Sequence, residues 1–94
     1  MTLNQIRYFL AVCDEANFTR AAKRCRISQP SLTNAVKALE NELGGCLFDR
    51  SECMKLTDLG YAVRPQFIKI MRAVNAAEEV ASQATWTARR SARR

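Results

Sequence analysis

The chain contains no histidine, and this absence narrows the chemistry that its 94 residues can support. Without imidazole, the most common general base and the most common metal ligand are both missing. The four cysteines, Cys13, Cys25, Cys46 and Cys53, are separated by 12, 21 and 7 positions, which matches no common zinc spacing. There is also no glycine-rich phosphate loop and no carboxylate cluster with ligand spacing. We therefore expect no enzyme activity, no metal site and no cofactor.

Glycine, proline and long apolar runs are also scarce. Three glycines and two prolines argue against disorder through the body of the chain. No run of about 18 apolar residues occurs, so no membrane span is expected. The first ten residues lack the positive start of a signal peptide, and charges recur at Arg7, Asp14 and Glu15. We expect a cytoplasmic protein with reduced cysteines, although Cys46 and Cys53 flank a predicted hairpin and could approach each other.

Acidic residues are missing from one long stretch of the sequence. None occurs between Glu15 and Glu40, where five cations fall: Arg20, Lys23, Arg24, Arg26 and Lys37. The net charge of +6 is weaker evidence for a polyanionic partner, because most of it lies at one end of the chain. Residues 1–60 hold eight Lys and Arg against seven Asp and Glu, whereas residues 61–94 hold seven Lys and Arg against two Asp and Glu. The prediction of a polyanionic partner therefore depends on the acid-free stretch and not on overall basicity.

Apolar spacing predicts three helices in the first half of the chain. Their starts are marked by side chains suited to N-capping, at Thr2, Asn17 and Ser28. The first helix should run to about Glu15, and Pro30 lies in the first turn of the third, where its missing N–H has no cost. Gly44 and Gly45 then end the third helix.

The third predicted helix has two different faces. Its apolar residues repeat at helical spacing and should pack inward: Leu32, Ala35, Val36, Leu39 and Leu43. The remaining polar positions should face outward: Ser31, Thr33, Asn34, Lys37 and Asn41. Short hydroxyl and amide side chains with one cation suit the edges of base pairs in a major groove. This face is the main sequence signal for nucleic-acid binding.

A small hairpin and a long helix complete the predicted elements. Residues 47–50 and 55–57 are strand candidates around a four-residue turn, and Thr57 should cap a fourth helix over roughly residues 58–84. Pro65 should kink that helix or remove one hydrogen bond. The predicted organisation is a DNA-binding domain over residues 1–57, a linker and dimerisation helix over 58–85, and a disordered basic tail over 86–94.

The fourth helix carries apolar residues at steps of three and four, close to heptad spacing: Leu59, Val63, Phe67, Ile70, Val74, Ala77, Ala81 and Ala84. A helix of about 25 residues is roughly 38 Å long, at about 1.5 Å per residue. A body of some 60 residues covers less than that, so we expect part of this stripe to form a dimer interface. Packing of the helix on its own domain is the alternative interpretation.

Three sequence blocks then give a family resemblance. F-T-x-A-A, S-Q-P-S and L-E-x-x-L-G-x-x-L-F-x-R begin at Phe18, Ser28 and Leu39, in that order. With Leu3, Phe9, Leu56-Thr57 and Gly60, the chain resembles the N-terminal DNA-binding domain of LysR-type transcriptional regulators over about residues 3–75. The resemblance implies a mainly α winged helix-turn-helix with a small β-hairpin wing and a long C-terminal linker helix. It further implies an antiparallel homodimer that binds an inverted repeat in double-stranded DNA.

The resemblance also implies which residues contact DNA and which pair in the dimer. With the third helix in the major groove and the wing at the minor groove, the implied contacts are Thr19, Arg20, Gln29, Pro30, Ser31, Thr33, Asn34, Lys37, Arg50 and Thr57. The linker helix would pair through Leu59, Val63, Phe67, Ile70, Val74, Ala77 and Ala81. Structural roles remain open for three of the contacts. Ser31 could only support the helix start, Thr57 is first an N-cap, and Arg50 could pair with Asp49 or Glu52.

The sequence departs from the family pattern in two places that matter for function. Glu52 puts an acid in the short wing turn, where repulsion from phosphate weakens the case for wing contacts. Family members also continue into an effector-sensing domain, whereas this sequence stops, as an excised domain or a naturally short protein would. We expect no small-molecule effector site in this chain. A second interpretation is a short interaction module that heterodimerises with a full-length regulator and modulates it.

Overall fold

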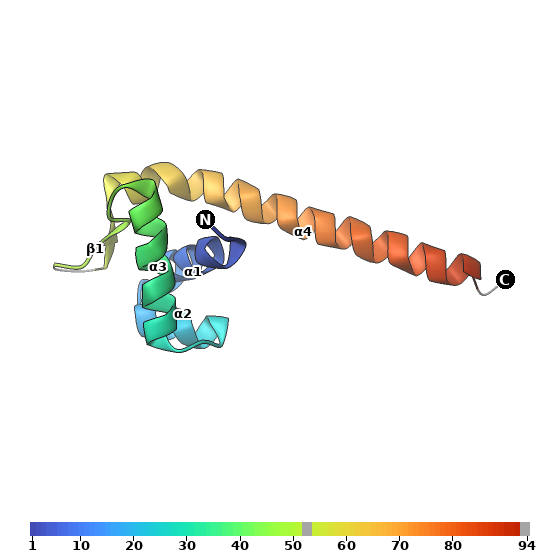
Figure 1. Ribbon diagram of the computed structural model, residues 1–94, viewed down its shortest axis with the longest axis horizontal. Helices are drawn as coiled ribbons and strands as arrows, with labels where there is room; N and C mark the ends of the chain where they lie inside the picture. The colour runs from blue at the N-terminus through green and yellow to red at the C-terminus, as the bar shows by residue number, and fades with distance from the viewer. Residues whose placement is uncertain (52–53, 93–94) are drawn as a thin grey trace.

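The computed structural model describes residues 1–51 and 54–92, with side chains placed through residue 89. Its elements follow in the order α1 (Leu3–Glu15), α2 (Phe18–Cys25), α3 (Gln29–Leu43), β1 (Phe48–Asp49), β2 (Lys55–Leu56) and α4 (Asp58–Ala92). The first three helices form a bundle, the hairpin extends from it, and most of α4 projects away as a long arm (Figure 1). The predicted mainly α fold, a winged helix-turn-helix with a long C-terminal helix, is confirmed.

All three predicted N-caps are confirmed. The side chains of Thr2, Asn17 and Ser28 each accept a backbone N–H from the first turn of their helix, at 2.9–3.2 Å. The same three helices end at left-handed residues with φ of 52°, 59° and 83°, at Ala16, Arg26 and Gly44. These stops keep the α2–α3 connection to three residues and so fix the angle of the helix-turn-helix.

The core lies where the three short helices meet the hairpin and the first turns of α4. Phe9 is fully buried at its centre, with ring centroids 5.3 Å from Phe48 and 5.5 Å from Phe67. The inward stripe predicted for α3 is confirmed, because Leu32, Val36 and Leu39 are completely buried. The hairpin is antiparallel, with Phe48 opposite Leu56, and it anchors one of the core aromatics.

The end of α4 differs from the prediction. The helix continues to Ala92, so the proposed disordered tail over 86–94 is wrong for residues 86–92, and residues 93–94 lie outside the described part of the chain. Alanine and arginine are strong helix formers, and no glycine or proline follows residue 65. Pro65 lies inside the helix, where its missing N–H removes one hydrogen bond without ending the element. No helix in the described ranges is long and apolar enough to cross a bilayer.

The first half of α4 belongs to the domain core. Phe67 is only 4% exposed and meets Phe9 edge-on, while Leu59, Val63 and Ile70 are partly buried against the same core. The prediction that Phe67 lies in a dimer interface is therefore wrong, because its ring is used within its own subunit. From Ala77 to Arg89 every side chain of α4 is exposed.

A close contact under α4 gives a stability prediction. A methyl group at Gly60 would overlap the carbonyl oxygen of Leu47 and approach Leu56 Cδ2 at 2.8 Å. Helix propensity alone would favour alanine by about 1 kcal/mol. We expect Gly60→Ala instead to lower the free energy of unfolding by about 1–3 kcal/mol through overpacking, measured by urea denaturation. Ser82→Ala, on the exposed part of α4, is the matched control and should stay within about 0.5 kcal/mol. A Gly60→Ala variant as stable as the parent would contradict this packing.

Candidate nucleic-acid interface

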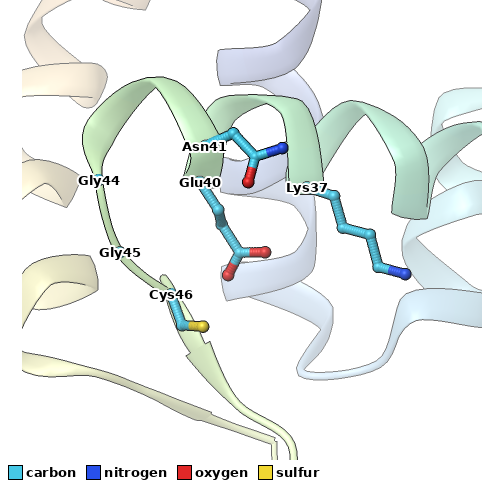
Figure 2. Close-up of a pocket in the computed structure, with 6 residues that line it drawn as sticks. All are labelled: Lys37, Glu40, Asn41, Gly44, Gly45 and Cys46. Carbon is cyan, nitrogen blue, oxygen red and sulfur yellow. The ribbon is translucent and has the colours of Figure 1, made fainter.

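The outward face of α3 is polar along its length, and the opposite, apolar face is fully buried at Leu32, Val36 and Leu39. Asn34, Lys37 and Asn41 are exposed, as are Gln29, Pro30 and Ser31 in the first turn. Thr33 is half-buried. Lys37 and Asn41 project from the same stretch of helix (Figure 2). Because the buried face fixes the rotation of α3, this polar surface is presented in one orientation, as the sequence predicted.

The first turns of α2 and α3 hold the remaining predicted contacts from the helix-turn-helix. Thr19 and Arg20 are exposed at the start of α2. Ser31 has the structural role that the sequence left open, since its backbone N–H and its hydroxyl both bond to Ser28 Oγ, at 3.2 and 2.8 Å. Its side chain remains exposed, so supporting the helix start does not remove it from the surface.

Two grooves with mixed polar and apolar linings extend from α3 to the hairpin. The first is lined by Lys37, Glu40, Asn41, Gly44, Gly45 and Cys46 (Figure 2). The second is lined by Cys46, Phe48, Asp49, Arg50, Ser51 and Thr57. Cys46 borders both grooves, which places Arg50 and Thr57 next to the surface that α3 presents.

Glu40 was missed as a functional residue by the sequence reasoning. It is only 8% exposed, and its carboxylate accepts the backbone N–H of Leu47 at 2.6 Å and a hydrogen bond from Arg50 Nη2 at 3.4 Å. A signal for its burial was present, because Val36, Glu40 and Leu43 share one helical face at i, i+4 and i+7. An acid on the apolar side of an amphipathic helix indicates a partner in the interior.

Arg50 therefore pairs with Glu40, an acid that the sequence did not suggest as its partner. Its guanidinium also lies over the ring of Phe18, with Cζ 4.9 Å from the centroid. Asp49 instead accepts hydrogen bonds from the hydroxyl and backbone N–H of Ser51, at 2.6 and 3.0 Å, and these bonds lower the pKa of the Asp49 carboxyl. Glu52, the other suggested partner, lies outside the described residues.

Thr57 is confirmed as the N-cap of α4. Its hydroxyl accepts the N–H of Gly60 at 3.1 Å and donates to the carbonyl oxygen of Cys46 at 2.6 Å. Phosphate oxygens only accept hydrogen bonds, so this hydroxyl proton is withheld from a phosphate while the bond to Cys46 persists. The structure thus favours the capping role that the sequence left open.

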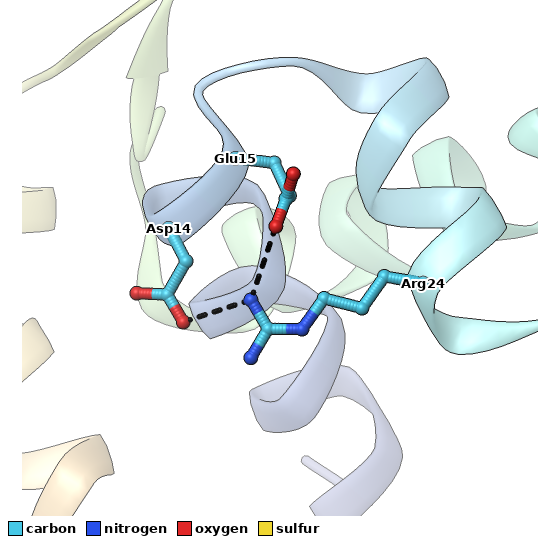
Figure 3. A network of polar contacts seen from close by, with 3 residues as sticks. All are labelled: Asp14, Glu15 and Arg24. Carbon is cyan, nitrogen blue, oxygen red and sulfur yellow. Dashed lines mark hydrogen bonds and ion pairs between the residues drawn. The ribbon is translucent and has the colours of Figure 1, made fainter.

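Arg24 is paired with acids of its own chain, whereas the acid-free stretch suggested a cation available to a polyanionic partner. Its Nη1 contacts Asp14 at 3.0 Å and Glu15 at 3.4 Å, at the C-terminal end of α1 (Figure 3). The hydrogen bond that the guanidinium donates to Asp14, followed by the one that it donates to Glu15, raises the pKa of Arg24. One of the five cations therefore has its charge balanced within the chain. The acids that precede the stretch in sequence fold back onto it, which linear charge counting does not show.

Among the described cysteines, Cys13 and Cys25 are half-buried and Cys46 is exposed. Burial raises the pKa of Cys13 to about 11, against a smaller opposing effect of Arg64, and it also raises the pKa of Cys25. Cys46 is exposed beside α3. Cys53 lies outside the described residues, so the suggested approach of Cys46 and Cys53 stays a hypothesis. Within residues 1–51 and 54–92, no group of His, Cys, Asp and Glu is arranged to hold a metal ion.

Thiol labelling tests this division. In a Cys53→Ser background at pH 8, we expect iodoacetamide to modify Cys46 at least about tenfold faster than Cys13, because only the thiolate reacts and a pKa of about 11 leaves Cys13 almost fully protonated. Cys13 should gain reactivity only as the pH approaches 11. Peptide mass spectrometry over a time course measures the rates, and a Cys46→Ser variant identifies the fast site. Equal rates at Cys13 and Cys46 would contradict the geometry.

Comparison with known proteins gives the family. The model for bacterial regulatory helix-turn-helix proteins of the lysR family matches residues 3–61. The HTH-type transcriptional regulator BudR of Klebsiella aerogenes is 45% identical over 82 residues, which cover 86% of this chain and 57% of BudR. The probable cat1 operon transcriptional activator of Acinetobacter lwoffii is 44% identical over 72 residues, or 76% of this chain and 24% of the activator. This chain thus spans little more than half of the first relative and about a quarter of the second.

Solved structures agree in fold as well as sequence. The CbnR_DBD–DNA complex superposes with a TM-score of 0.81 at 34% identity, covering 90% of this chain and 99% of that one. The BenM_DBD/catB site 1 DNA complex gives 0.84 at 35% identity, with 90% and 97% covered. The family model covers well over half of the 94 residues. The matched range contains α1, α2, α3 and the hairpin. The chain belongs to the LysR family of bacterial regulatory helix-turn-helix proteins.

Proposed function

We propose that this chain is the sequence-specific DNA-binding module of a transcriptional regulator, with α3 lying in the major groove of double-stranded DNA. The observation that carries the proposal is the exposed polar face of α3, held in one orientation by three fully buried residues beneath it. Amide and hydroxyl groups on such a face can pair with base edges, and Lys37 can pair with guanine or phosphate. Two family members of similar fold were solved with DNA bound, which supports the same partner here.

The proposed contacts fall into two groups. Gln29, Pro30, Thr33, Asn34 and Lys37 would read bases, since they line the exposed side of α3. Thr19, Arg20, Ser31 and Arg50 would bind phosphates or position the domain. Thr57 would act mainly by capping α4, because its hydroxyl is already bonded on both sides. The Arg-rich end of α4 is a source of further nonspecific phosphate attraction.

We also propose a homodimer formed through α4. The molecule is 62 Å in its longest dimension and 26 Å in the next, and the outer half of α4 accounts for the excess (Figure 1). The end of the predicted stripe furthest from the core is formed by Val74, Ala77, Ala81 and Ala84, whereas Leu59, Val63 and Ile70 turn part of their surface to their own domain. Pairing along the outer half would set the distance between two α3 helices and hence the half-site spacing of an inverted repeat.

The heterodimerising alternative drew its support from an acidic wing turn. Glu52 lies outside the described residues, so the structure adds nothing in favour of that alternative. Both proposals can be separated by asking whether the purified chain binds DNA by itself. Selection from a pool of random duplexes, followed by sequencing and footprinting, should return an inverted repeat bound at nanomolar concentration near physiological salt. Equal binding to all sequences would contradict the sequence-specific proposal.

Asn34 gives a test of base reading. Asn34→Ala should cost about 1–3 kcal/mol of binding free energy on the selected duplex and relax preference at one base position in each half-site. The measurement is a competition titration against duplexes altered at single positions. Asn4→Ala removes the same side chain from an exposed position on α1 and should leave both affinity and preference unchanged. An Asn34→Ala variant with the parent's full base preference would contradict the proposed contact.

Ala81 gives a test of the dimer. Ala81→Asp puts a charge on the proposed stripe, and burying two unpaired carboxylates in a symmetric interface should weaken association at least about tenfold. Light scattering after size exclusion, over a dilution series, measures the dissociation constant. Ser82→Asp adds the same charge one position away, outside the predicted stripe, and should change the dissociation constant of the dimer little. A dimer equally stable in both variants would exclude pairing through this face.

A further inference from the structure

The base of the hairpin holds an arginine between two elements of the helix-turn-helix. Arg50 donates from Nη2 to Glu40 Oε1 at 3.4 Å, and its guanidinium lies 4.9 Å from the ring centroid of Phe18. Glu40 comes from α3 and Phe18 from the first turn of α2. The side chain of Arg50 nevertheless remains 37% exposed, whereas that of Glu40 is only 10% exposed. The guanidinium of Arg50 is thus bonded through Nη2 to a nearly buried acid, while part of the Arg50 side chain is exposed to solvent.

The carboxylate that holds Arg50 is itself fixed. Its second oxygen accepts the backbone N–H of Leu47 at 2.6 Å, a short, charge-assisted bond within the protein. The backbone carbonyl of Glu40 accepts the N–H groups of Gly44 and Gly45, at 2.9 and 3.1 Å. Glu40 therefore ties the end of α3 to the whole segment that leads into β1. The bond from Leu47 N–H holds the carboxylate of Glu40 in place, and Arg50 contacts that carboxylate, so Arg50 meets a partner from a defined position.

The Arg50 side chain keeps exposed surface for a second partner, since it is 37% exposed. An arginine carries five N–H donors in a planar fork, and the bond to Glu40 uses only one of its two edges. The groove lined by Arg50, Ser51 and Thr57 adjoins, through Cys46, the groove beside α3. A phosphate that bound beside the hairpin could accept from such a fork, and a fork held in place loses less conformational entropy on binding.

From these contacts we infer that Glu40 is a positioning residue for DNA binding, acting through Arg50. It holds the guanidinium of Arg50 in the orientation that binds a backbone phosphate beside α3. This inference depends on the proposed function, since it names a phosphate as the partner. By this inference, the buried acid Glu40 raises the affinity for DNA through Arg50. Its own negative charge would lower that affinity, because a carboxylate repels phosphate.

Removing the charge of Glu40 therefore distinguishes the two effects, because loss of positioning should weaken DNA binding whereas loss of a negative charge alone should not. Glu40→Gln keeps the size of the side chain and one acceptor for Leu47 N–H, but it no longer pairs with Arg50. Glu42→Gln is the matched control, since Glu42 lies on the same helix, is exposed and forms an ion pair with the Met1 amine. Removing an acid near DNA should leave affinity unchanged or raise it, and we expect this of Glu42→Gln. We expect Glu40→Gln instead to weaken binding to the selected duplex about fivefold to tenfold, as loss of a positioned charge contact does.

A double-mutant comparison decides whether the effect passes through Arg50. Arg50→Met alone should weaken binding about tenfold, and adding Glu40→Gln to it should cause little further loss. A general effect of Glu40 on folding would instead persist in the Arg50→Met background. Circular dichroism and thermal melting of each variant show whether it is folded at the assay temperature. Parent-like affinity of Glu40→Gln, or an equal loss in both backgrounds, would overturn the inference.

Arg50→Lys keeps the test decisive if Glu40→Gln does not fold. Lysine retains the charge but is a point donor that cannot hold a carboxylate and a phosphate on separate edges of a rigid fork. We expect at least about a fivefold loss of affinity despite the unchanged net charge. Parent-like binding by Arg50→Lys would overturn the positioning role. Failure of the unmodified chain to bind any selected duplex would overturn the proposed function and this inference with it, whereas the results above overturn the inference alone.

Discussion

The hydrogen bond from the Leu47 amide to the Glu40 carboxylate is the contact on which the arrangement of the interface depends. It joins the end of α3 to the segment that enters the hairpin. That segment is joined in turn to the start of α4, because Leu47 O accepts the N–H of Thr57 at 3.0 Å and Cys46 O accepts its hydroxyl at 2.6 Å. Three residues, Cys46, Leu47 and Thr57, thus lie between the helix proposed to read DNA and the helix proposed to pair two subunits. A change in the angle of one helix must disturb the other.

The long α4 helix has two halves with different surroundings. Its first half completes the core through Phe67, and its outer half is exposed along every described side chain after residue 76. A small body gains stability from the first half, since a domain of this size buries only a modest fraction of its surface. The exposed side chains of the outer half bury little surface against their own domain, and the ion pair of Glu78 with Arg7 of α1, at 3.7 Å, is a surface pair of small energy, which is why we propose a second subunit there. The first half of α4 therefore completes the core of one domain, and in the proposed dimer the outer half sets the distance between two domains.

Local features of the fold could be predicted from the sequence, whereas contacts between distant residues could not. The caps at Thr2, Asn17 and Ser28 depend on groups three residues away, so short motifs reveal them. Phe67 was assigned to a dimer because heptad spacing does not distinguish a partner helix from the domain's own core. Arg24 and Arg50 were read as free or locally paired cations, yet each finds an acid nine or ten positions away on another element. The end of α4 is not visible in the sequence, because apolar periodicity ends well before the helix does at Ala92.

The central claim is that the polar face of α3 lies against nucleotide edges. The most direct measurement is the amide spectrum of the isotope-labelled chain, recorded with and without a duplex that it selects. The account predicts that the largest shifts fall on residues 29–41 and around Arg50, with the outer half of α4 moving little in an already dimeric protein. Shifts confined to α4 or to the α1 surface near Arg24, with residues 29–41 unmoved, would contradict it.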